Sequence, residues 1–318
     1  MGTSSILDKY RQEINQLLVD IYPEGPRSLA KPIQYVLSGG GKRLRPILTL
    51  FCANACGGNK ENAMPAALAV EILHNFTLVH DDIMDRDIIR HGQQTVHSKW
   101  NDGVAILTGD AMLSLALKLI NQTSSLREKQ MSLFIDGLLA VCEGQALDKE
   151  YENQLNVSLD DYMNMIDLKT GYLIGLSAQI GATSANIDLD ICLKLRNYGR
   201  FLGRAFQIQD DYLEIFSNSK EMGKSLKSDI LLGKKTFLMI IALEKDRKII
   251  ENYLHIINKD FASGLAKIRD YLKESGIVED TINEVNKNIE LANKQINSLD
   301  IKKNDLLYLS ELIRKRGS

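Results

Sequence analysis

The chain has 318 residues and a formal net charge of −2, because 39 lysines and arginines nearly balance 41 acidic residues. Without a basic excess, the composition lacks the electrostatic footprint of a nucleic-acid-binding protein. Apolar residues make up 44% of the chain, enough to build a sizeable core in a single domain. With only 5 prolines, the composition favours long helices over many short strands.

Cysteine usage and the apolar stretches bear on the compartment. The four cysteines form no C-x-x-C pair, which argues against a disulfide scaffold or a zinc site and fits a reducing cytoplasm. The first residues lack the charged and apolar regions of a secretory signal. The most apolar stretch, Val104–Ile120, is interrupted by Asp110 and Lys118 and is short for a bilayer span. We therefore expect a cytoplasmic protein with no integral membrane segment.

Apolar residues recur at helical spacing along almost the whole chain, and no strand-like alternation of any length is present. The segment 63–87 is apolar on more than one face, which is typical of a helix at the centre of a bundle. Further helices are predicted over residues 46–55, 102–120, 128–151, 159–181, 188–216 and 228–245, with amphipathic outer helices in the last third. The pattern predicts an all-α protein with one domain over residues 1–318.

The segment His80–Asp85 places acidic residues at the end of the most apolar predicted helix. Asp81 and Asp85 are four residues apart and share one helix face, with Asp82 beside them. Like charges at this spacing repel, and the apolar run before them makes unpaired charge costlier still. Something must neutralise them. Their hard oxygen ligands suit Mg²⁺, which takes one or two carboxylates plus substrate phosphate oxygens and water.

A second segment, Phe206–Glu214, repeats this spacing with Asp210, Asp211 and Glu214. One such motif alone would more often be a solvated acidic patch or a helix-capping cluster. Two copies on two separate apolar helices instead predict facing helices that share a cluster of metal ions.

Three polar loops, at residues 38–45, 90–97 and 217–235, carry the residue types that grip phosphate. Lys42 and Arg45 lie three apart in the first loop and could both reach one diphosphate. Lys224 and Lys234 flank Asp229 in the third. Metal ions and fixed cations stabilise a departing diphosphate best in a site that excludes water. The loops and the carboxylates together predict a cage of the size of a diphosphate.

These segments resemble those of the trans-isoprenyl diphosphate synthase family, of the short-chain farnesyl or geranylgeranyl type. The matches, in the family's order, are GGGKRLRP (39–46), HDDIMD (80–85), GQQTVH (92–97), GD (109–110), EGQ (143–145), KT (169–170), FQIQDDYLE (206–214) and GKSLKSDILLGKKT (223–236). The resemblance implies a single-domain bundle of antiparallel helices around a central cavity, usually as a homodimer.

The resemblance also implies a Mg²⁺-dependent reaction that joins isopentenyl diphosphate to an allylic diphosphate. Up to three ions would be held by Asp81, Asp85 and Asp210, supported by Asp82, Asp211 and Glu214. The allylic diphosphate would be gripped by Arg90, Lys169, Lys224 and Lys234, and isopentenyl diphosphate by Lys42, Arg45 and His74. Thr170 and Gln207 match positions whose oxygens face the allylic cation, and the released diphosphate would accept the final proton.

Three positions depart from the family's pattern. His91 follows Arg90 where the family has a second arginine, so a group near neutral at pH 7 replaces a fixed cation at the isopentenyl diphosphate site. This predicts weaker affinity that improves at lower pH, or a compensating Lys or Arg nearby. Glu214 stands in place of Asp, which preserves function if that position need not ligate directly. The basic segment Arg314–Arg316 either closes over the site or is an ordinary solvated tail.

The helix of the first acidic motif also sets the cavity floor in this family. Phe76 and Thr77 are the fifth and fourth residues upstream of Asp81. A large aromatic at the former position would stop elongation early, which favours C15 to C20 products and geranylgeranyl diphosphate in particular. Phe76 could instead be ordinary core packing.

The sequence argues against two other functions. A terpene cyclase would carry an NDxxSxxxE-type second motif, and neither Asn101-Asp102 nor Asn304-Asp305 is followed by that pattern. An inactive regulatory subunit of a heteromeric synthase tends to lose the aspartates, whereas this chain keeps five of six and an acid at the sixth position. Both alternatives are therefore disfavoured.

Overall fold

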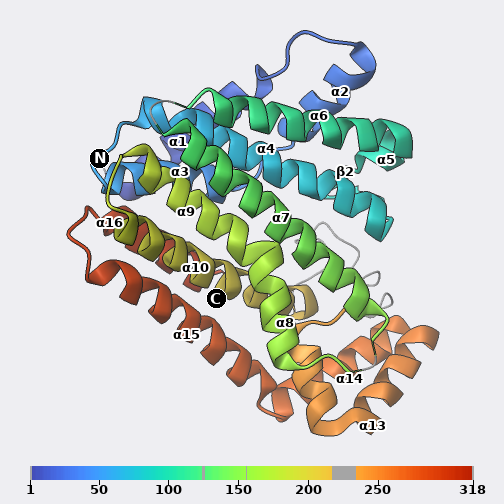
Figure 1. The fold of residues 1–318 in the computed structure, drawn as a ribbon. Coiled ribbons are helices and arrows are strands. Elements are labelled where there is room, and N and C mark those ends of the chain that lie inside the picture. The colour runs from blue at the N-terminus through green and yellow to red at the C-terminus, as the bar shows by residue number, and fades with distance from the viewer. Residues whose placement is uncertain (1, 124–125, 155, 217–233, 317–318) are drawn as a thin grey trace.

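A computed structural model describes residues 2–123, 126–154, 156–216 and 234–316. Within them the chain is almost entirely helical, which confirms the predicted all-α class (Figure 1). The α-helices are α1 (Thr3–Val19), α2 (Arg27–Leu37), α3 (Leu44–Ala55), α4 (Lys60–Asp85), α5 (Val96–Lys99), α6 (Asp102–Asn121), α7 (Arg127–Glu152), α8 (Leu159–Ile166), α9 (Tyr172–Ser184), α10 (Leu189–Phe216), α13 (Phe237–Lys259), α14 (Phe261–Glu274), α15 (Ile277–Asn297) and α16 (Asn304–Arg314). Part of the helix predicted at 228–245 lies outside the described residues, and residues 234–236 are not helical.

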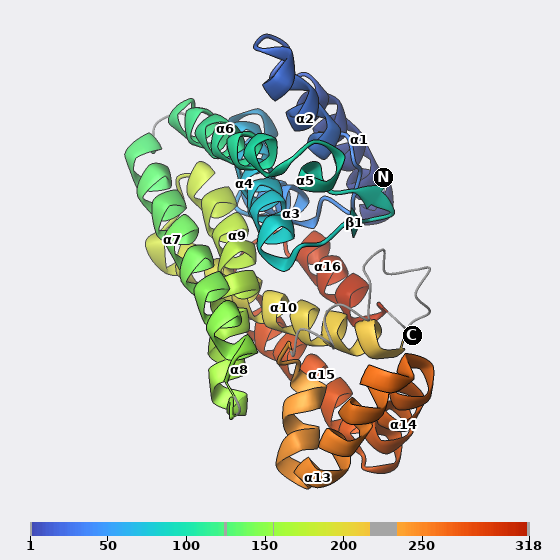
Figure 2. The same ribbon diagram turned by 90° about the vertical axis from the view of Figure 1, so that its right-hand side faces the viewer.

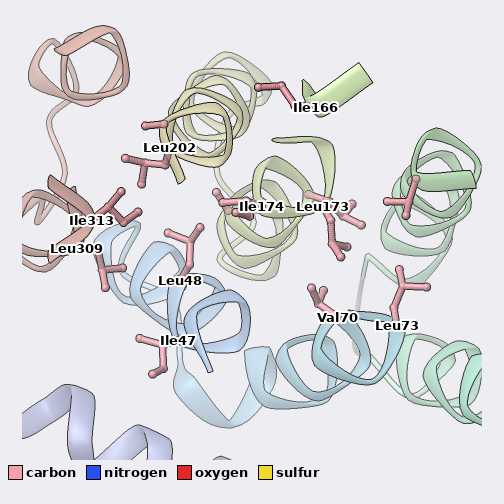
Figure 3. Packing of buried hydrophobic residues seen from close by; sticks show 14 of the residues in the cluster. Ile47, Leu48, Val70, Leu73, Ile166, Leu173, Ile174, Leu202, Leu309 and Ile313 are labelled. Carbon is pink, nitrogen blue, oxygen red and sulfur yellow. The ribbon is translucent and has the colours of Figure 1, made fainter. Parts of the chain in front are cut away.

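The centre of the bundle is formed by α9, α3 and α4. Every residue of α9 from Leu173 to Thr183 is buried, as expected for a helix that is apolar all round. Leu173 and Ile174 of α9 lie among Ile47 and Leu48 of α3, Val70 of α4 and Leu202 of α10 (Figure 3). The helix predicted as central, α4, is also buried over most of its length, so the sequence pattern identified one of the central helices.

The outer helices close the bundle around this centre. The helix α10 packs between α9 and α15, α6 runs along α4, and α13 and α14 form a pair at one end (Figures 1 and 2). Among the described residues, one helix, α6, is long and apolar enough to cross a bilayer, and 33% of its most apolar window is buried in the bundle. The stretch 104–120 was expected to be short for a bilayer span. The helix that contains it has 20 residues and reaches the necessary length.

The predicted helix at 159–181 is interrupted. Residues Asp167–Gly171 form a single π-helical turn, labelled η1, between α8 and α9. A side chain at Gly203 of α10 would collide with the backbone of Gly171, so α10 passes unusually close to this turn. Arg200 and Arg204 of α10 both bind the buried carboxylate of Asp167. A π-turn inserts extra backbone into a helix and commonly occurs at functional sites. Here it carries Lys169 and Thr170.

A short β-hairpin with two residues in each strand follows α4. The end of α4 is fixed by Arg86, whose φ of 56° cannot continue a right-handed helix. Strands β1 (Ile89–Arg90) and β2 (Gln93–Gln94) then pair antiparallel, with Arg90 opposite Gln93. Among the described residues this is the only β structure, and sequence alternation missed it because each strand has only two residues.

The glycine-rich loop before α3 is held by a buried arginine. Arg43 adopts a left-handed φ of 50° and is only 4% exposed. Its guanidinium donates to Glu71 Oε1 of α4 at 2.7 Å, to Asn15 Oδ1 at 2.8 Å and to the Leu37 carbonyl at 2.7 Å. Arg43 is therefore held by partners from α1, α2 and α4, and it fixes the position of the loop next to Lys42.

Replacing Arg43 with methionine leaves the Glu71 carboxylate buried without its cation. Breaking one side of a buried pair costs about 3–5 kcal/mol, so the midpoint of urea unfolding should fall strongly. Arg11→Met is the matched control, because Arg11 pairs with Asp8 at 2.9 Å in an exposed position. It should change the free energy of unfolding by less than about 1 kcal/mol. Equal effects of the two substitutions would contradict this account.

Candidate active site

One cavity of about 1010 Å³ collects nearly all of the residues that the sequence singled out. Those that line it are Lys42, Arg45, His74, Phe76, Thr77, Asp81, Asp82, Arg90, His91, Lys169, Thr170, Gln207, Asp210, Asp211, Glu214 and Lys234. Asp85 is not among the lining residues, because its side chain is fully buried. Lys224 and Asp229 lie outside the described residues.

The first acidic motif occupies the C-terminal end of α4, where Asp81, Asp82 and Asp85 are all buried. Arg90 of β1 donates from Nε to Asp82 Oδ1 at 2.5 Å, and its Nη2 lies 3.8 Å from Asp81 Oδ2. Burial would lower the pKa of Arg90, but the charges of Asp82 and Asp81 outweigh burial and raise it. The hairpin thus supplies one of the cations that the motif requires.

Lysines from three other segments reach the same motif. Lys169 of η1 lies 3.7 Å from Asp81 Oδ1 and donates to Asp148 at 2.5 Å. Asp85 accepts from Lys149 of α7 at 2.5 Å and from Lys234, just before α13, at 3.1 Å. Lys169 and Lys234 are among the residues that the sequence motifs predicted. Asp148 and Lys149 are not, because their only signal is their position just after the EGQ segment of a predicted helix.

The two aspartates of the second acidic motif, on α10, have different hydrogen-bond partners. Asp211 accepts from the hydroxyl of Tyr162 at 2.6 Å, the backbone N–H of Phe237 at 3.0 Å and Nε2 of Gln207 at 3.0 Å. Burial raises the pKa of Asp211 to about 6, although these three donors favour the charged form. Asp211 is therefore oriented by the protein itself, and Gln207 is oriented with it.

Asp210 instead pairs with the C-terminal segment. Arg316 Nη2 lies 2.7 Å from Asp210 Oδ1, and its guanidinium lies over the ring of Phe206 at 4.0 Å. Gln209 donates to the Arg316 carbonyl and holds the segment in place. The sequence left open whether the basic tail covers the site or is solvated. The structure places Arg316 in the cavity wall.

A basic wall of the cavity is formed by four residues from four elements, namely Lys42 of the glycine-rich loop, Arg45 of α3, His74 of α4 and His91 of the hairpin turn. Burial, together with the charges of Arg45 and Arg90, holds the pKa of His74 well below 6.5, so its imidazole is neutral at pH 7. Arg45 Nε is buried with no hydrogen-bond partner among the described residues. A buried guanidinium N–H without an acceptor suits an anionic ligand.

Thr170 connects the π-turn to the second motif. Its hydroxyl donates to Gln207 Oε1 at 2.9 Å, and Gln207 passes the interaction on to Asp211. Both residues line the cavity, as their predicted position facing a cation requires.

The apolar part of the cavity wall includes Val141, Met165, Leu173, Phe206 and Phe76. The Phe76 ring meets that of His80 edge-on, with 4.8 Å between centroids. Thr77 also lines the cavity, and its hydroxyl is turned to the His74 carbonyl at 2.8 Å. Phe76 therefore belongs to the hydrophobic core and also lines the cavity.

A metal ion fits the chemistry of this site only with help from a substrate. No three His, Cys, Asp or Glu side chains within the described ranges converge closely enough to hold an ion by themselves. The available acids are nevertheless all oxygen donors, and Mg²⁺ commonly takes one or two carboxylates and completes its shell with phosphate oxygens and water. The donor set therefore suits a metal ion that is bound together with a phosphate group, beside the apolar part of the cavity wall.

Comparison with known proteins supports this arrangement. The family model for polyprenyl synthetase matches residues 26–273. The chain is 42% identical over 237 residues to a geranylgeranyl diphosphate synthase of Saccharolobus solfataricus, covering 72% of this chain and 71% of that one. It is 38% identical over 312 residues to a geranylgeranyl pyrophosphate synthase of Geoglobus acetivorans, covering 96% and 95%. The crystal structure of geranylgeranyl pyrophosphate synthetase from Pyrococcus horikoshii superposes with a TM-score of 0.91 at 34% identity, covering 99% and 98%.

Proposed function

The chain belongs to the polyprenyl synthetase family, and on that premise we propose that it joins isopentenyl diphosphate to an allylic diphosphate to give geranylgeranyl diphosphate. The observation that carries this proposal is the single cavity that unites two acidic motifs, a basic wall and an apolar pocket. A terpene cyclase uses one diphosphate and would not need the second phosphate-binding site formed by Lys42, Arg45 and His74.

The allylic diphosphate would bind between the acidic motifs. Asp81, Asp85 and Asp210 would hold Mg²⁺, supported by Asp82, Asp211 and Glu214, and the metal would neutralise the departing diphosphate. Arg90, Lys169 and Lys234 already lie against the first motif and can turn to the phosphate oxygens. Lys224 keeps its predicted role in the same grip. These groups lower the barrier to ionisation, because they stabilise the charge that develops on the leaving group.

Isopentenyl diphosphate would bind the basic wall. Lys42 and Arg45 would hold its phosphates, and the neutral His74 would donate or accept a single hydrogen bond. Its double bond then attacks the allylic cation beside Thr170 and Gln207. The new carbon–carbon bond leaves a tertiary cation that loses a proton, and the released diphosphate would accept this proton.

A homodimer is proposed from an apolar face. Ile106 and Leu107 of α6 and Ile135 and Leu139 of α7 are between 47% and 62% exposed on two helices that contact each other. A second copy would cover these four apolar side chains, which would otherwise stay in contact with water. We propose on the same ground that α6 is an interface helix of a cytoplasmic protein and not a membrane span. A monomer in sedimentation equilibrium would contradict the dimer.

The function is tested by incubating the purified chain with isopentenyl diphosphate and farnesyl diphosphate in the presence of Mg²⁺. We expect a C20 diphosphate by mass spectrometry, and no product after chelation with EDTA, because the acidic motifs depend on metal to bind the diphosphate. Formation of a cyclised hydrocarbon, or no condensation by the chain alone, would contradict the proposal.

Replacing Phe76 with alanine tests the cavity floor. Removing the ring opens space beyond the end of a C20 chain, so the main product should lengthen by one or more five-carbon units. Phe134→Ala is the matched control, because Phe134 is fully buried on α7 and does not line the cavity. It should lower stability by about 3–5 kcal/mol without changing the product. An unchanged chain length in Phe76→Ala would show that Phe76 is not the floor.

Replacing His91 with arginine tests the least typical residue of the basic wall. A permanent cation should lower KM for isopentenyl diphosphate at pH 8. In the wild type, KM should fall as the pH drops from 8 to 6, because an imidazole gains charge over that range. The same titration of His91→Arg corrects for protonation of the substrate, since its guanidinium does not titrate. An equal KM in the two proteins at pH 8 would refute the prediction.

A further inference from the structure

Asp85 differs from the other acids of its motif because it is closed off from the cavity. Its side chain has no exposed area, and both of its oxygens are engaged by lysines. Lys149 lies 2.5 Å from Oδ1 and Lys234 lies 3.1 Å from Oδ2. Both lysines line the cavity, so each stands where Asp85 would otherwise meet an incoming cation.

The two lysines are held differently. Lys149 lies on the last turn of α7 and also donates to Glu152 Oε1 of the same helix at 2.9 Å. Burial would lower the pKa of Lys149, but its hydrogen bonds to Asp85 and Glu152 outweigh burial and raise it, so it remains charged. Lys149 is therefore anchored by a second carboxylate, Glu152, on its own helix. Lys234 instead lies on a non-helical segment before α13.

We propose that Lys149 is a fixed counter-ion of Asp85, a positioning residue that weakens the binding of free divalent cations to the first acidic motif until the diphosphate arrives. This inference rests on the proposed function, which makes Asp85 a metal ligand. It adds a residue that lies outside the short motifs named in the sequence and that the reaction scheme above does not use.

The charges around the motif support the proposal. Asp81, Asp82 and Asp85 carry three negative charges, and Arg90, Lys149, Lys169 and Lys234 bring four positive charges to within 4 Å of them. The same cations also pair with Asp87, Asp148 and Glu152. A free metal ion must nevertheless compete with these four cations for the oxygens of the three motif aspartates. A diphosphate supplies new acceptors for Arg90, Lys169 and Lys234, which uncovers the carboxylates. Glu152 keeps Lys149 in place, so that it continues to hold one oxygen of Asp85.

Binding of Mn²⁺ to the substrate-free enzyme, followed by electron paramagnetic resonance, tests the proposal without turnover. Lys149→Met removes the charge and keeps most of the side-chain length. Mn²⁺ should then bind about tenfold more tightly, since unit charges a few ångströms apart interact by more than 1.4 kcal/mol even at an effective dielectric of 20. Lys149→Arg restores the charge and should return the dissociation constant to the wild-type value.

Lys60→Met is the matched control. Lys60 bridges α4 to Glu13 of α1 at 2.8 Å, and its side chain is 28% exposed compared with 27% for Lys149. It lies at the opposite end of α4 from the acidic motif. Its loss removes a comparable bridge between helices but should leave Mn²⁺ affinity unchanged.

Thermal unfolding of each variant shows whether it is folded. Unchanged or weaker Mn²⁺ binding in folded Lys149→Met would overturn the proposal, because it would mean that Lys149 does not oppose the metal. If Lys149→Met fails to fold, Lys149→Gln takes its place with the same expectation. Failure of the wild type to bind Mn²⁺ even with inorganic diphosphate would count against the metal site itself. Normal wild-type binding with no effect at Lys149 would count against this inference alone.

Discussion

Three carboxylates buried at the C-terminal end of one helix are the constraint around which the rest of this site is arranged. The end of a helix carries a partial negative charge, so Asp81, Asp82 and Asp85 occupy the less favourable end of α4, and its last turn contains no basic residue. Buried charges of one sign persist only when paired. The cations must therefore come from elsewhere in the chain. Each cation that pairs with the motif forms an ion pair between α4 and another element.

Those cations explain the order of the bundle near the cavity. Arg90 requires the hairpin to fold back over the end of α4, Lys149 brings the end of α7 alongside, and Lys169 requires the π-turn. The turn in turn needs Asp167 to be held by α10, which carries the second acidic motif. The ion pairs that stabilise the buried aspartates are thus formed by the same cations that, in the proposed function, would surround a diphosphate.

The sequence was sufficient for the features that depend on local spacing. Helical periodicity predicted the fold class and the positions of α4, α6, α7 and α10 to within a few residues, and sixteen of the predicted site residues line one cavity. It could not reveal partners created by helices crossing in space. Lys149 looks like any solvated lysine of an amphipathic helix until α7 meets α4. The π-turn depends on the close approach of Gly203 and Gly171, which are 32 residues apart.

The hydrogen bonds between Thr170, Gln207 and Asp211 run in one direction. The ionised Asp211 can only accept, so Gln207 presents its N–H₂ group to Asp211 and its carbonyl to Thr170. The Thr170 hydroxyl in turn donates its hydrogen to that carbonyl. The lone pairs of Thr170 are then what remains for the cavity. Under the proposed function, a carbocation formed beside Thr170 would meet an electron-rich oxygen whose hydrogen is already donated. This hydroxyl would then not act as an acid that protonates the new double bond.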